Sequence, residues 1–263
     1  MATPTRIAEA GGAEFLNRLA ARGRSGDDRA LPTDACRPPA NLEPVRVKTV
    51  LDGDTIRLKK GGDVRLIGLD TPELGHDGDP DMPGARNAGR ALRRLVRLAG
   101  NRIYLQQGQH LRDRYGRLLA HAFTHRGESL TRRMLSRGLG YQIAIPPNLG
   151  YLACYRDAEA QARRQGLGVW RGPVREAATL RGDERGFHLL QGEVERVGRV
   201  PGALRLNLRG GLAVRIARED LAAFRLSDLK GLVGRRLEVR GWLYRYNGEQ
   251  RLRIRHPSAL RWL

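Results

Sequence analysis

Apolar and polar residues alternate along much of the chain beyond residue 44, with the period that is typical of β-strands. In the first half these runs are separated by glycine turns, at Gly53 and at the Gly61–Gly62 pair. The predicted strands cover residues 45–50, 55–58, 64–69, 103–106 and 118–123. We therefore expect this half of the chain to be mainly β.

Three stretches of the same half have a helical period instead, and they cover residues 85–99, 128–137 and 151–165. In the first stretch one face is apolar, the opposite face carries arginines, and Gly100 follows as a C-terminal cap. The predicted apolar face consists of Ala88, Ala91, Leu92, Leu95 and Leu98. Such faces predict helices that pack against the strands.

The second half returns to strand alternation after residues 173–188, a polar stretch with glycines that we interpret as a linker. The predicted strands cover residues 189–197, 204–208, 212–216, 237–240 and 251–254. A helix-like stretch, 218–224, follows the third strand, and Asn247-Gly248 is typical of a hairpin turn between the last two. Five strands with a helix between the third and the fourth have the order of an OB-fold.

Residues 1–43 are predicted to form a tail. A short helix over residues 8–21 is weakened by glycines, and three prolines interrupt the chain that follows. Residues 1–30 contain no continuous apolar core of the kind that a secretory signal needs, so no signal peptide is seen.

The chain has 263 residues, with 48 Lys and Arg against 28 Asp and Glu, and a formal charge of +20. Its 40% of hydrophobic residues can form a core, which excludes wholesale disorder. The sequence has no run of 18 apolar residues, so we expect no stable membrane insertion. The basic excess favours a polyanionic partner, above all nucleic acid, DNA or RNA. Nearly all of the positive charge is arginine, which binds phosphate through two parallel hydrogen bonds, although an arginine-biased genome explains that preference equally well.

Three short segments concentrate charged residues at predicted turns. They are Asp52-Gly53-Asp54-Thr55, then Arg65 followed by Asp70-Thr71-Pro72-Glu73, and then Arg112-Asp113-Arg114-Tyr115-Gly116-Arg117. Each lies beside an apolar strand, where loops present functional groups from a rigid scaffold. One segment alone would be ordinary turn chemistry, and the conjunction of all three indicates a site.

The residue types in these segments suit metal-assisted cleavage of a phosphodiester. Asp54 and Asp70 offer the hard oxygen ligands that Ca²⁺ and Mg²⁺ prefer. Arg65 and Arg117 can bind a phosphate and stabilise the charge that grows in the transition state. Glu73 could take a proton from an attacking water. The three segments contain no histidine, so a histidine base is not favoured.

In this order, with the third segment continuing to Ala120, the segments resemble the staphylococcal nuclease (thermonuclease) family over residues 44–172. The resemblance implies a five-stranded OB-fold barrel followed by helices, and a Ca²⁺-dependent nuclease acting on DNA and RNA. The expected fold class is mainly β with helices (α+β), with a second, smaller OB-like barrel. The expected organisation is a tail (1–43), a nuclease-like domain (44–172), a linker (173–188) and an OB-like domain (189–263).

The resemblance also implies roles within the site. Asp54 and Asp70 would bind Ca²⁺ through their carboxylates, and Thr71 through its backbone carbonyl. Glu73 would act as the base for the attacking water or orient that base, and the two arginines would hold the scissile phosphate. Family members attack the 5′ side of the phosphorus and leave 3′-phosphate ends.

The candidate substrate-binding residues are Tyr115 and Asp113. Tyr115 matches a family tyrosine near the nucleotide pocket. A second family tyrosine falls at Ala144 here, where nearby Tyr141 could substitute, so the departure concerns substrate affinity rather than chemistry. The alternative to a nuclease is a non-catalytic nucleic-acid-binding protein on the same barrel. The presence of every charged position favours the enzyme.

The two cysteines, Cys36 and Cys154, leave two interpretations open. They could form one disulfide between the tail and the third predicted helix, or they could be unrelated thiols. A disulfide, together with the family, favours an extracytoplasmic or secreted protein. We expect a monomer.

The C-terminal domain has arginines at polar strand positions and aromatic residues near its hairpin. These residues are Arg205, Arg215, Arg240, Arg251, Arg253 and Arg255, with Trp242, Tyr244 and Tyr246. An OB-fold with such a surface binds single-stranded nucleic acid. The simpler interpretation is that alternating arginines keep one face of the sheet soluble.

Overall fold

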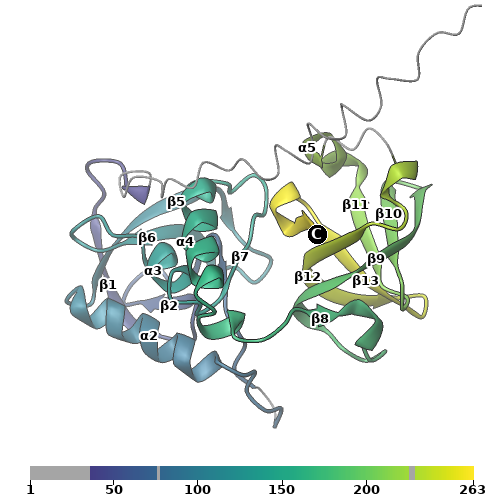
Figure 1. Ribbon diagram of the computed structural model, residues 1–263. Coiled ribbons are helices and arrows are strands. Elements are labelled where there is room, and N and C mark those ends of the chain that lie inside the picture. Colours follow the sequence, from purple (N-terminus) through teal and green to yellow (C-terminus); the bar gives the residue numbers. More distant parts are fainter. Residues whose placement is uncertain (1–35, 76–77, 225–228) are drawn as a thin grey trace, which may run out of the picture. The chain divides into compact units, whose positions relative to one another are not determined.

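The computed structural model describes residues 36–75, 78–224 and 229–263 of the chain (Figure 1). Over these ranges the protein is mainly β, with two closed barrels of five strands each and few helices. The predicted fold class is therefore confirmed. The helix predicted over residues 8–21 lies outside the described residues.

The first barrel consists of β1 (Pro44–Val50), β2 (Thr55–Leu58), β3 (Asp63–Leu66), β5 (Arg102–Arg112) and β6 (Leu118–Phe123). Its strand order is β1-β2-β3-β6-β5, and the pairing of β5 with β1 closes the ring. Side chains alternate between the two faces. In β3, Val64 and Leu66 are buried in the core, whereas Arg65 between them lies on the outer face.

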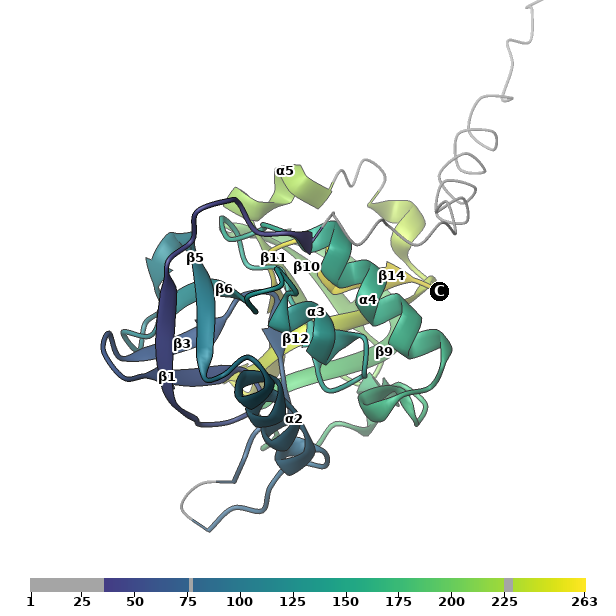
Figure 2. The same ribbon diagram turned by 90° about the vertical axis from the view of Figure 1, so that its left-hand side faces the viewer.

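Three helices pack against this barrel, and they are α2 (Ala85–Leu98), α3 (Leu130–Leu135) and α4 (Leu152–Arg164) (Figure 2). In α2 the buried stripe includes Leu92, Leu95 and Val96. The prediction that Leu98 belongs to the apolar face is wrong, because this side chain is 72% exposed. At 3.6 residues per turn, residue 98 falls outside the stripe.

The strand predicted over residues 64–69 is interrupted in the structure. After β3, Gly68 adopts a φ of +84°, and β4 (Leu69–Asp70) pairs with β7 (Tyr141–Gln142), which the sequence pattern did not predict. A Cβ at Gly68 would lie 2.4 Å from the ring of Tyr155, so both the backbone and the close packing require glycine here. The turn places Asp70 on a two-stranded sheet separate from the barrel.

The second barrel consists of β9 (Gly186–Val200), β10 (Ala203–Leu208), β11 (Ala213–Ala217), β12 (Arg236–Tyr246) and β13 (Glu249–Ile254). It repeats the strand order of the first barrel, as β9-β10-β11-β13-β12, and closes where β12 pairs with β9. At the predicted hairpin, Asn247 and Gly248 have φ values of 49° and 80°. Two consecutive positive φ values are what a type I′ turn requires.

Several short elements complete the second barrel. Between β11 and β12 lie η4 (Arg218–Asp220), α5 (Leu221–Phe224) and η5 (Lys230–Leu232), where a helix was predicted. β8 (Arg175–Glu176) pairs with β9, and β14 (Leu260–Trp262) pairs with β12. The remaining 3-10 helices are η2 (Gly168–Trp170), η3 (Ala177–Thr179) and η6 (Pro257–Ala259). The predicted linker thus carries structure of its own, in β8 and η3.

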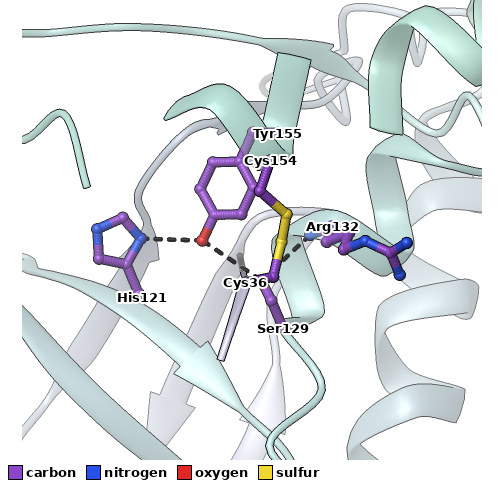
Figure 3. The surroundings of a disulfide bond; sticks show 6 residues. All are labelled: Cys36, His121, Ser129, Arg132, Cys154 and Tyr155. Carbon is purple, nitrogen blue, oxygen red and sulfur yellow. Dashed lines mark hydrogen bonds between the residues drawn. A yellow bond between two sulfur atoms is a disulfide. The ribbon is translucent and has the colours of Figure 1, made fainter. Parts of the chain in front are cut away.

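Cys36 and Cys154 form a disulfide between the segment before β1 and helix α4, with their Cα atoms 5.8 Å apart (Figure 3). Both cysteines are buried in the core of the first barrel. The neighbouring Tyr155 is also buried, and its hydroxyl lies 3.0 Å from Nδ1 of His121 and accepts a hydrogen bond from Ser129. The disulfide and the contacts of the Tyr155 hydroxyl with His121 and Ser129 together hold α4 against the barrel.

Two ion pairs, one buried and one partly buried, join α4 to β12. Nη1 of Arg240 lies 2.7 Å from both carboxylate oxygens of Glu159, and it donates a further hydrogen bond to the carbonyl of Gln142 in β7. Arg163 forms two parallel hydrogen bonds with the buried carboxylate of Glu238. Arg240, predicted for the polar surface of the second barrel, is therefore buried in an ion pair instead.

Within the part of the chain that the structure describes, no helix has the length and apolar character that crossing a membrane requires.

Candidate active site

The turn before β2 positions the first aspartate of the site. Oδ1 of Asp52 accepts hydrogen bonds from the backbone N–H groups of Asp54 and Thr55, at 2.9 and 2.7 Å, and so fixes the turn. A Cβ on Gly53 would lie 2.5 Å from Oγ1 of Thr71, which is closer than side chains approach one another. Glycine at position 53 thus lets the two loops of the site touch.

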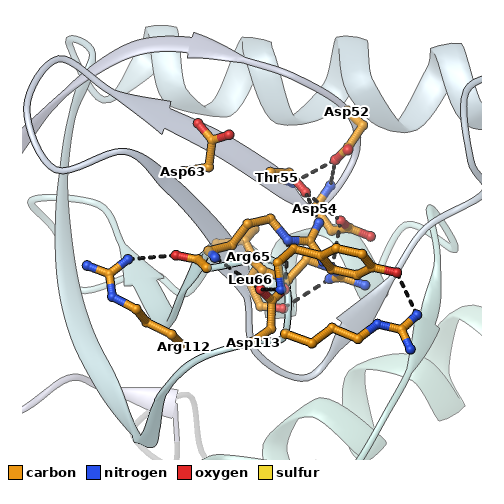
Figure 4. Close-up of polar contacts among 12 residues, drawn as sticks. Asp52, Asp54, Thr55, Asp63, Arg65, Leu66, Arg112 and Asp113 are labelled. Carbon is orange, nitrogen blue, oxygen red and sulfur yellow. Dashed lines mark hydrogen bonds and ion pairs between the residues drawn. The ribbon is translucent and has the colours of Figure 1, made fainter.

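Arg65 is the centre of the site (Figure 4). Its Nε lies 3.1 Å from Oδ1 of Asp54, its Nη2 donates to Oδ1 of Asp70 at 2.6 Å, and its Nη1 donates to the carbonyl of Leu69 at 2.5 Å. The side chain is only 11% exposed. A buried guanidinium needs anionic partners, because an unpaired buried charge is costly, and two aspartates supply them here.

Thr71 connects the same two loops from the other side. Its backbone N–H and its hydroxyl both donate to Oδ2 of Asp54, at 2.9 and 3.0 Å. Asp54, Asp70 and Thr71, the three predicted metal ligands, are all buried. The structure brings them together around one guanidinium, although they come from segments 16 residues apart in the sequence.

The third charged segment joins the site through Arg117. Its Nη1 lies 3.4 Å from Oγ1 of Thr55, and that hydroxyl in turn donates to Oδ1 of Asp54 at 3.1 Å. Nε of Arg117 donates to Oδ2 of Asp113 at 2.7 Å. Oδ1 of Asp113 accepts from the backbone N–H groups of Tyr115 and Arg117, so this carboxylate holds the loop and aims the arginine. A direct contact of Asp113 with substrate remains a prediction.

Tyr115 lies at the edge of the site, and the residue is 67% exposed. The guanidinium of Arg114 stacks over the ring at 4.7 Å, and that of Arg117 lies 5.4 Å from its centre. Tyr141 has a different environment, because its ring packs against Trp170 and Phe187 at 5.3 Å each. Tyr141 thus packs on both of these rings, and its substitution for the second family tyrosine stays a prediction.

Carboxylates outnumber guanidiniums around Arg65. Burial alone would lower the pKa of Arg65, but Asp54, Asp70 and more distant carboxylates outweigh burial and raise it. Burial also raises the pKa of Asp70 well above its usual range, against the opposing effect of Arg65. Burial and the charge of Asp54 together raise the pKa of Asp52. A site with this excess of negative charge favours a cation.

Glu73 is the exposed carboxylate of the site. Desolvation at the mouth of the site raises the pKa of Glu73, and the charges of Asp54 and Asp52 raise it further, while Arg65 and Arg117 oppose the shift. The backbone of Glu73 is fixed by its carbonyl, which accepts from the N–H of Met82 at 2.9 Å. The predicted base therefore lies within electrostatic reach of the aspartates and both arginines named above and is open to water.

The donor set fits a divalent cation. Among residues 36–75, 78–224 and 229–263, no three His, Cys, Asp or Glu side chains form a metal cluster by themselves. The predicted set needs only the carboxylates of Asp54 and Asp70 and the carbonyl of Thr71, with water to complete the oxygen ligands that Ca²⁺ prefers. The surplus of carboxylates around Arg65 is the structural observation that supports this fit.

The sequence predicts a turn at Gly53 but no role in the site for Asp52 or Thr55. The Asp-Gly-Asp-Thr pattern indicates the role of Asp52, because an aspartate side chain often accepts a hydrogen bond from the backbone N–H two residues further on and so fixes a turn. Gly140 was missed altogether. A Cβ there would lie 2.4 Å from the carbonyl of Asp70, so this glycine lets β7 approach β4.

The first barrel has the strand order of an OB-fold, and Asp54 and Asp70 both pair with Arg65 of its third strand. Residues 63–172 match the model of the family described as "Staphylococcal nuclease homologue". The chain is 33% identical over 127 residues to a thermonuclease of Staphylococcus intermedius, which is 47% of this chain and 74% of that protein. The chain belongs to the staphylococcal nuclease family.

Two further relatives bear the same kind of name. A thermonuclease of Staphylococcus hyicus is 31% identical over 134 residues, 50% of this chain and 78% of that protein. Endonuclease YncB of Bacillus subtilis is 30% identical over 130 residues, 48% of this chain and 61% of that protein. The similarity in each case covers about half of this chain.

Proposed function

We propose that this protein is a calcium-dependent endonuclease that hydrolyses phosphodiester bonds in DNA or RNA and leaves 3′-phosphate ends. One observation carries the proposal: Asp54 and Asp70 converge on the guanidinium of Arg65, and the hydroxyl of Thr55 links Asp54 to Arg117. The names of the relatives, thermonuclease and endonuclease, support the same reaction.

The arginines would bind the substrate. Arg65 is held by two carboxylates and a carbonyl, so its position is fixed before substrate arrives. Arg117 is held by Asp113 and is more exposed, at 28%. Preorganised cations of this kind stabilise the negative charge that grows on the phosphate oxygens in the transition state. Ca²⁺ bound by Asp54, Asp70 and the Thr71 carbonyl would supply further charge neutralisation and polarise the phosphate.

Glu73 would receive the proton. As water attacks the phosphorus, one water proton passes to the Glu73 carboxylate, the P–O5′ bond breaks, and the 5′ oxygen takes a proton from solvent. A carboxylate with a raised pKa is a stronger base than an ordinary glutamate. The products are then a 3′-phosphate and a 5′-hydroxyl.

Digestion of supercoiled plasmid tests the proposal. The parent protein should nick and linearise the plasmid with Ca²⁺ and not with a chelator, and end-group analysis should find 3′-phosphates. Glu73→Gln should lose about 10²–10⁴ in rate, which is the usual contribution of a general base. Glu128→Gln, the same change at an exposed glutamate paired with Arg133, is the matched control and should cut normally.

The alternative function is nucleic-acid binding without cleavage. It gains some support from the ion pairs of Arg65, which give Asp54 and Asp70 a cationic partner within the chain itself. Binding without cleavage in the Ca²⁺, chelator and Glu73→Gln reactions would establish this alternative.

The proposal extends to the setting of the protein. The Cys36–Cys154 disulfide supports an oxidising, extracytoplasmic location, since such bonds persist there. We also propose that the protein acts as a monomer and that residues 44–172 and 189–263 are its two domains.

A further inference from the structure

The outer face of the second barrel contains a hollow that the nuclease site does not use. It has a volume of about 330 Å³ and is lined by residues that include Pro201, Arg205, Arg215, Tyr244, Tyr246 and Arg251. We call it the arginine–tyrosine groove. Alternate residues of the same strands, such as Leu204, Val214 and Leu252, form the barrel core, so the groove lies on the solvent side of the sheet.

The groove occupies a defined place in the OB topology. Arg205 is in the second strand of the barrel (β10), Arg215 is in the third (β11), and Pro201 is in the loop between the first two strands. Tyr246 is the last residue of the fourth strand, at the hairpin to the fifth. The face of strands two and three, between these two loops, is where OB-folds bind oligonucleotides and oligosaccharides.

Like charges are stacked across this face. Arg205 in β10 is directly opposite Arg215 in β11. Like charges opposite one another on neighbouring strands destabilise a sheet, so an anion bound over them would be favoured. Arg215 has no ion-pair or hydrogen-bond partner among the described residues. Its Nη2 lies beside Gly202 in the loop between β9 and β10, 3.9 Å from where a Cβ on that glycine would be. This guanidinium is available to a ligand.

One carboxylate organises the groove without cancelling its charge. Glu249 accepts from Nη2 of Arg205 at 2.6 Å and from Nη2 of Arg251 at 2.8 Å. The hydrogen bonds from Arg251 and Arg205 lower the pKa of Glu249, so it stays ionised. Three guanidiniums against one carboxylate leave a net positive groove, and each paired guanidinium keeps further N–H donors for a phosphate.

Aromatic rings supply the second element of recognition. Tyr246 is 54% exposed, and one face of its ring is covered by the guanidinium of Arg251 at 4.3 Å. Tyr244 lies two residues earlier on the same face of β12 and also lines the groove. Rings beside a basic strand face can stack with the bases of a single strand, whereas paired bases in a duplex are not available for stacking.

We propose that the arginine–tyrosine groove binds single-stranded nucleic acid, with phosphates on Arg215 and its neighbours and a base stacked on Tyr246. The proposal refines the prediction from sequence. Arg253 is paired with Glu219 and Asp220, and Trp242 packs against Phe187, so neither belongs to the groove. The inference shares only the class of ligand with the proposed nuclease activity, and it requires no cleavage.

Binding of a fluorescent oligothymidylate of about 12 nucleotides, within the range of OB-fold site sizes, tests the proposal by anisotropy. The full chain carries Glu73→Gln in chelator throughout, so that no substrate is cut. Tyr246→Ala should raise Kd by about 5- to 100-fold, as the loss of one stacked base does. Arg215→Ala should weaken binding and lower the slope of log K against log salt by about 0.7, the value for one phosphate of a single strand.

Arg209→Ala is the matched control. Arg209 belongs to the same barrel and directly follows the last residue of β10. Its side chain is 69% exposed and forms an ion pair with Glu193. It should change Kd by less than about threefold, because exposed charges outside a contact are screened by salt. Circular dichroism and melting check the fold, and Tyr246→Leu and Arg215→Gln repeat the comparison with less loss of packing.

Three results would overturn the proposal. The first is groove variants that bind like Arg209→Ala. The second is a blunt duplex that binds as tightly as the single strand, and the third is a heparin fragment that binds equally well with no effect of Tyr246→Ala. Failure of the groove is distinct from failure of the proposed function: the former leaves plasmid cleavage intact, and the latter leaves the oligonucleotide binding intact.

Discussion

The two barrels share one strand order and place charge on their outer faces in opposite ways. In the first barrel, Asp54, Asp70 and Arg65 are nearly closed to water, and the carboxylates are in excess. In the second barrel the arginines of the groove are in excess and only half-buried, and Glu249 lies between two of them. One scaffold thus supports a site suited to a cation and a face suited to a polyanion, which shows why function must be argued from the site.

The difference arises from what each barrel adds to its strands. In the first barrel the short strand β4, which pairs with β7, supplies the Leu69 carbonyl and the Asp70 carboxylate that hold Arg65 of β3. In the second barrel the equivalent face, β10 and β11, remains open as the groove. Burial strengthens electrostatic interactions and fixes geometry, whereas an open face can accept a long ligand.

The largest expected effect is that of Arg65→Lys in the buried site. An ammonium cannot keep the contacts to Asp54, Asp70 and the Leu69 carbonyl while binding phosphate through two parallel bonds. We expect cleavage to slow by about 10²–10³-fold, the usual loss for one preorganised donor. Arg57→Lys, on the same face but in an exposed pair with Asp63, should cut normally. Equal losses in both variants would show that charge near the barrel, and not the buried geometry, matters.

The next effect concerns pH and the core of the first barrel. Burial lowers the pKa of His121 to about 4 from its usual 6.5. The folded protein therefore favours the neutral ring, so this stabilisation is complete above pH 6.5 and is lost as the pH falls toward 4. The free energy of unfolding of the parent should fall by about 3 kcal/mol more than that of His121→Gln over this interval.

Urea unfolding at a series of pH values measures this difference. The control is His125→Gln, which changes an exposed histidine two residues beyond the end of β6. Its pH profile should follow that of the parent. Parallel pH profiles for the parent and His121→Gln would contradict the expected burial of the imidazole.

A smaller effect is expected for the contact between the two loops of the site. In Gly53→Ala the new Cβ would meet Oγ1 of Thr71 and the Cβ of Ala88, at 2.5 and 2.6 Å. Overpacking of this kind costs about 1–3 kcal/mol of stability. Calorimetry should show a lower Tm for this variant, while Gly172→Ala, where nothing lies within 4 Å of the new atom, should melt like the parent.

The smallest effect is expected for Glu249→Gln, which changes the groove of the second barrel and leaves the first barrel untouched. Glu249→Gln removes the only carboxylate that bridges Arg205 and Arg251 in the described groove. Because the pair is exposed, the free energy of unfolding should change by no more than about 1 kcal/mol. Single-strand binding should become a few-fold tighter, by roughly the same energy. A weaker complex would mean that Glu249 is needed to hold the guanidiniums in place.

The sequence predicted much of this arrangement because its signals were local. Turn residues and strand alternation identified both sets of five strands, and three charged segments identified the side chains that meet around Arg65. The misses depend on contacts between distant residues. β7 is only two residues long and exists because it pairs with β4. Arg240 resembles any other arginine at a polar strand position, and only the approach of Glu159 reveals that it is buried.

The Cys36–Cys154 bond closes a ring of chain with a sequence separation of 118. Both segments that build the candidate active site, around Arg65 and around Arg117, lie inside that ring. A protease that cuts one peptide bond between the two cysteines would therefore leave its two fragments covalently joined. In surroundings rich in proteases, a nicked molecule of this kind would migrate as two pieces on a gel only after reduction, and until then the residues of the candidate site would stay in one covalently joined molecule.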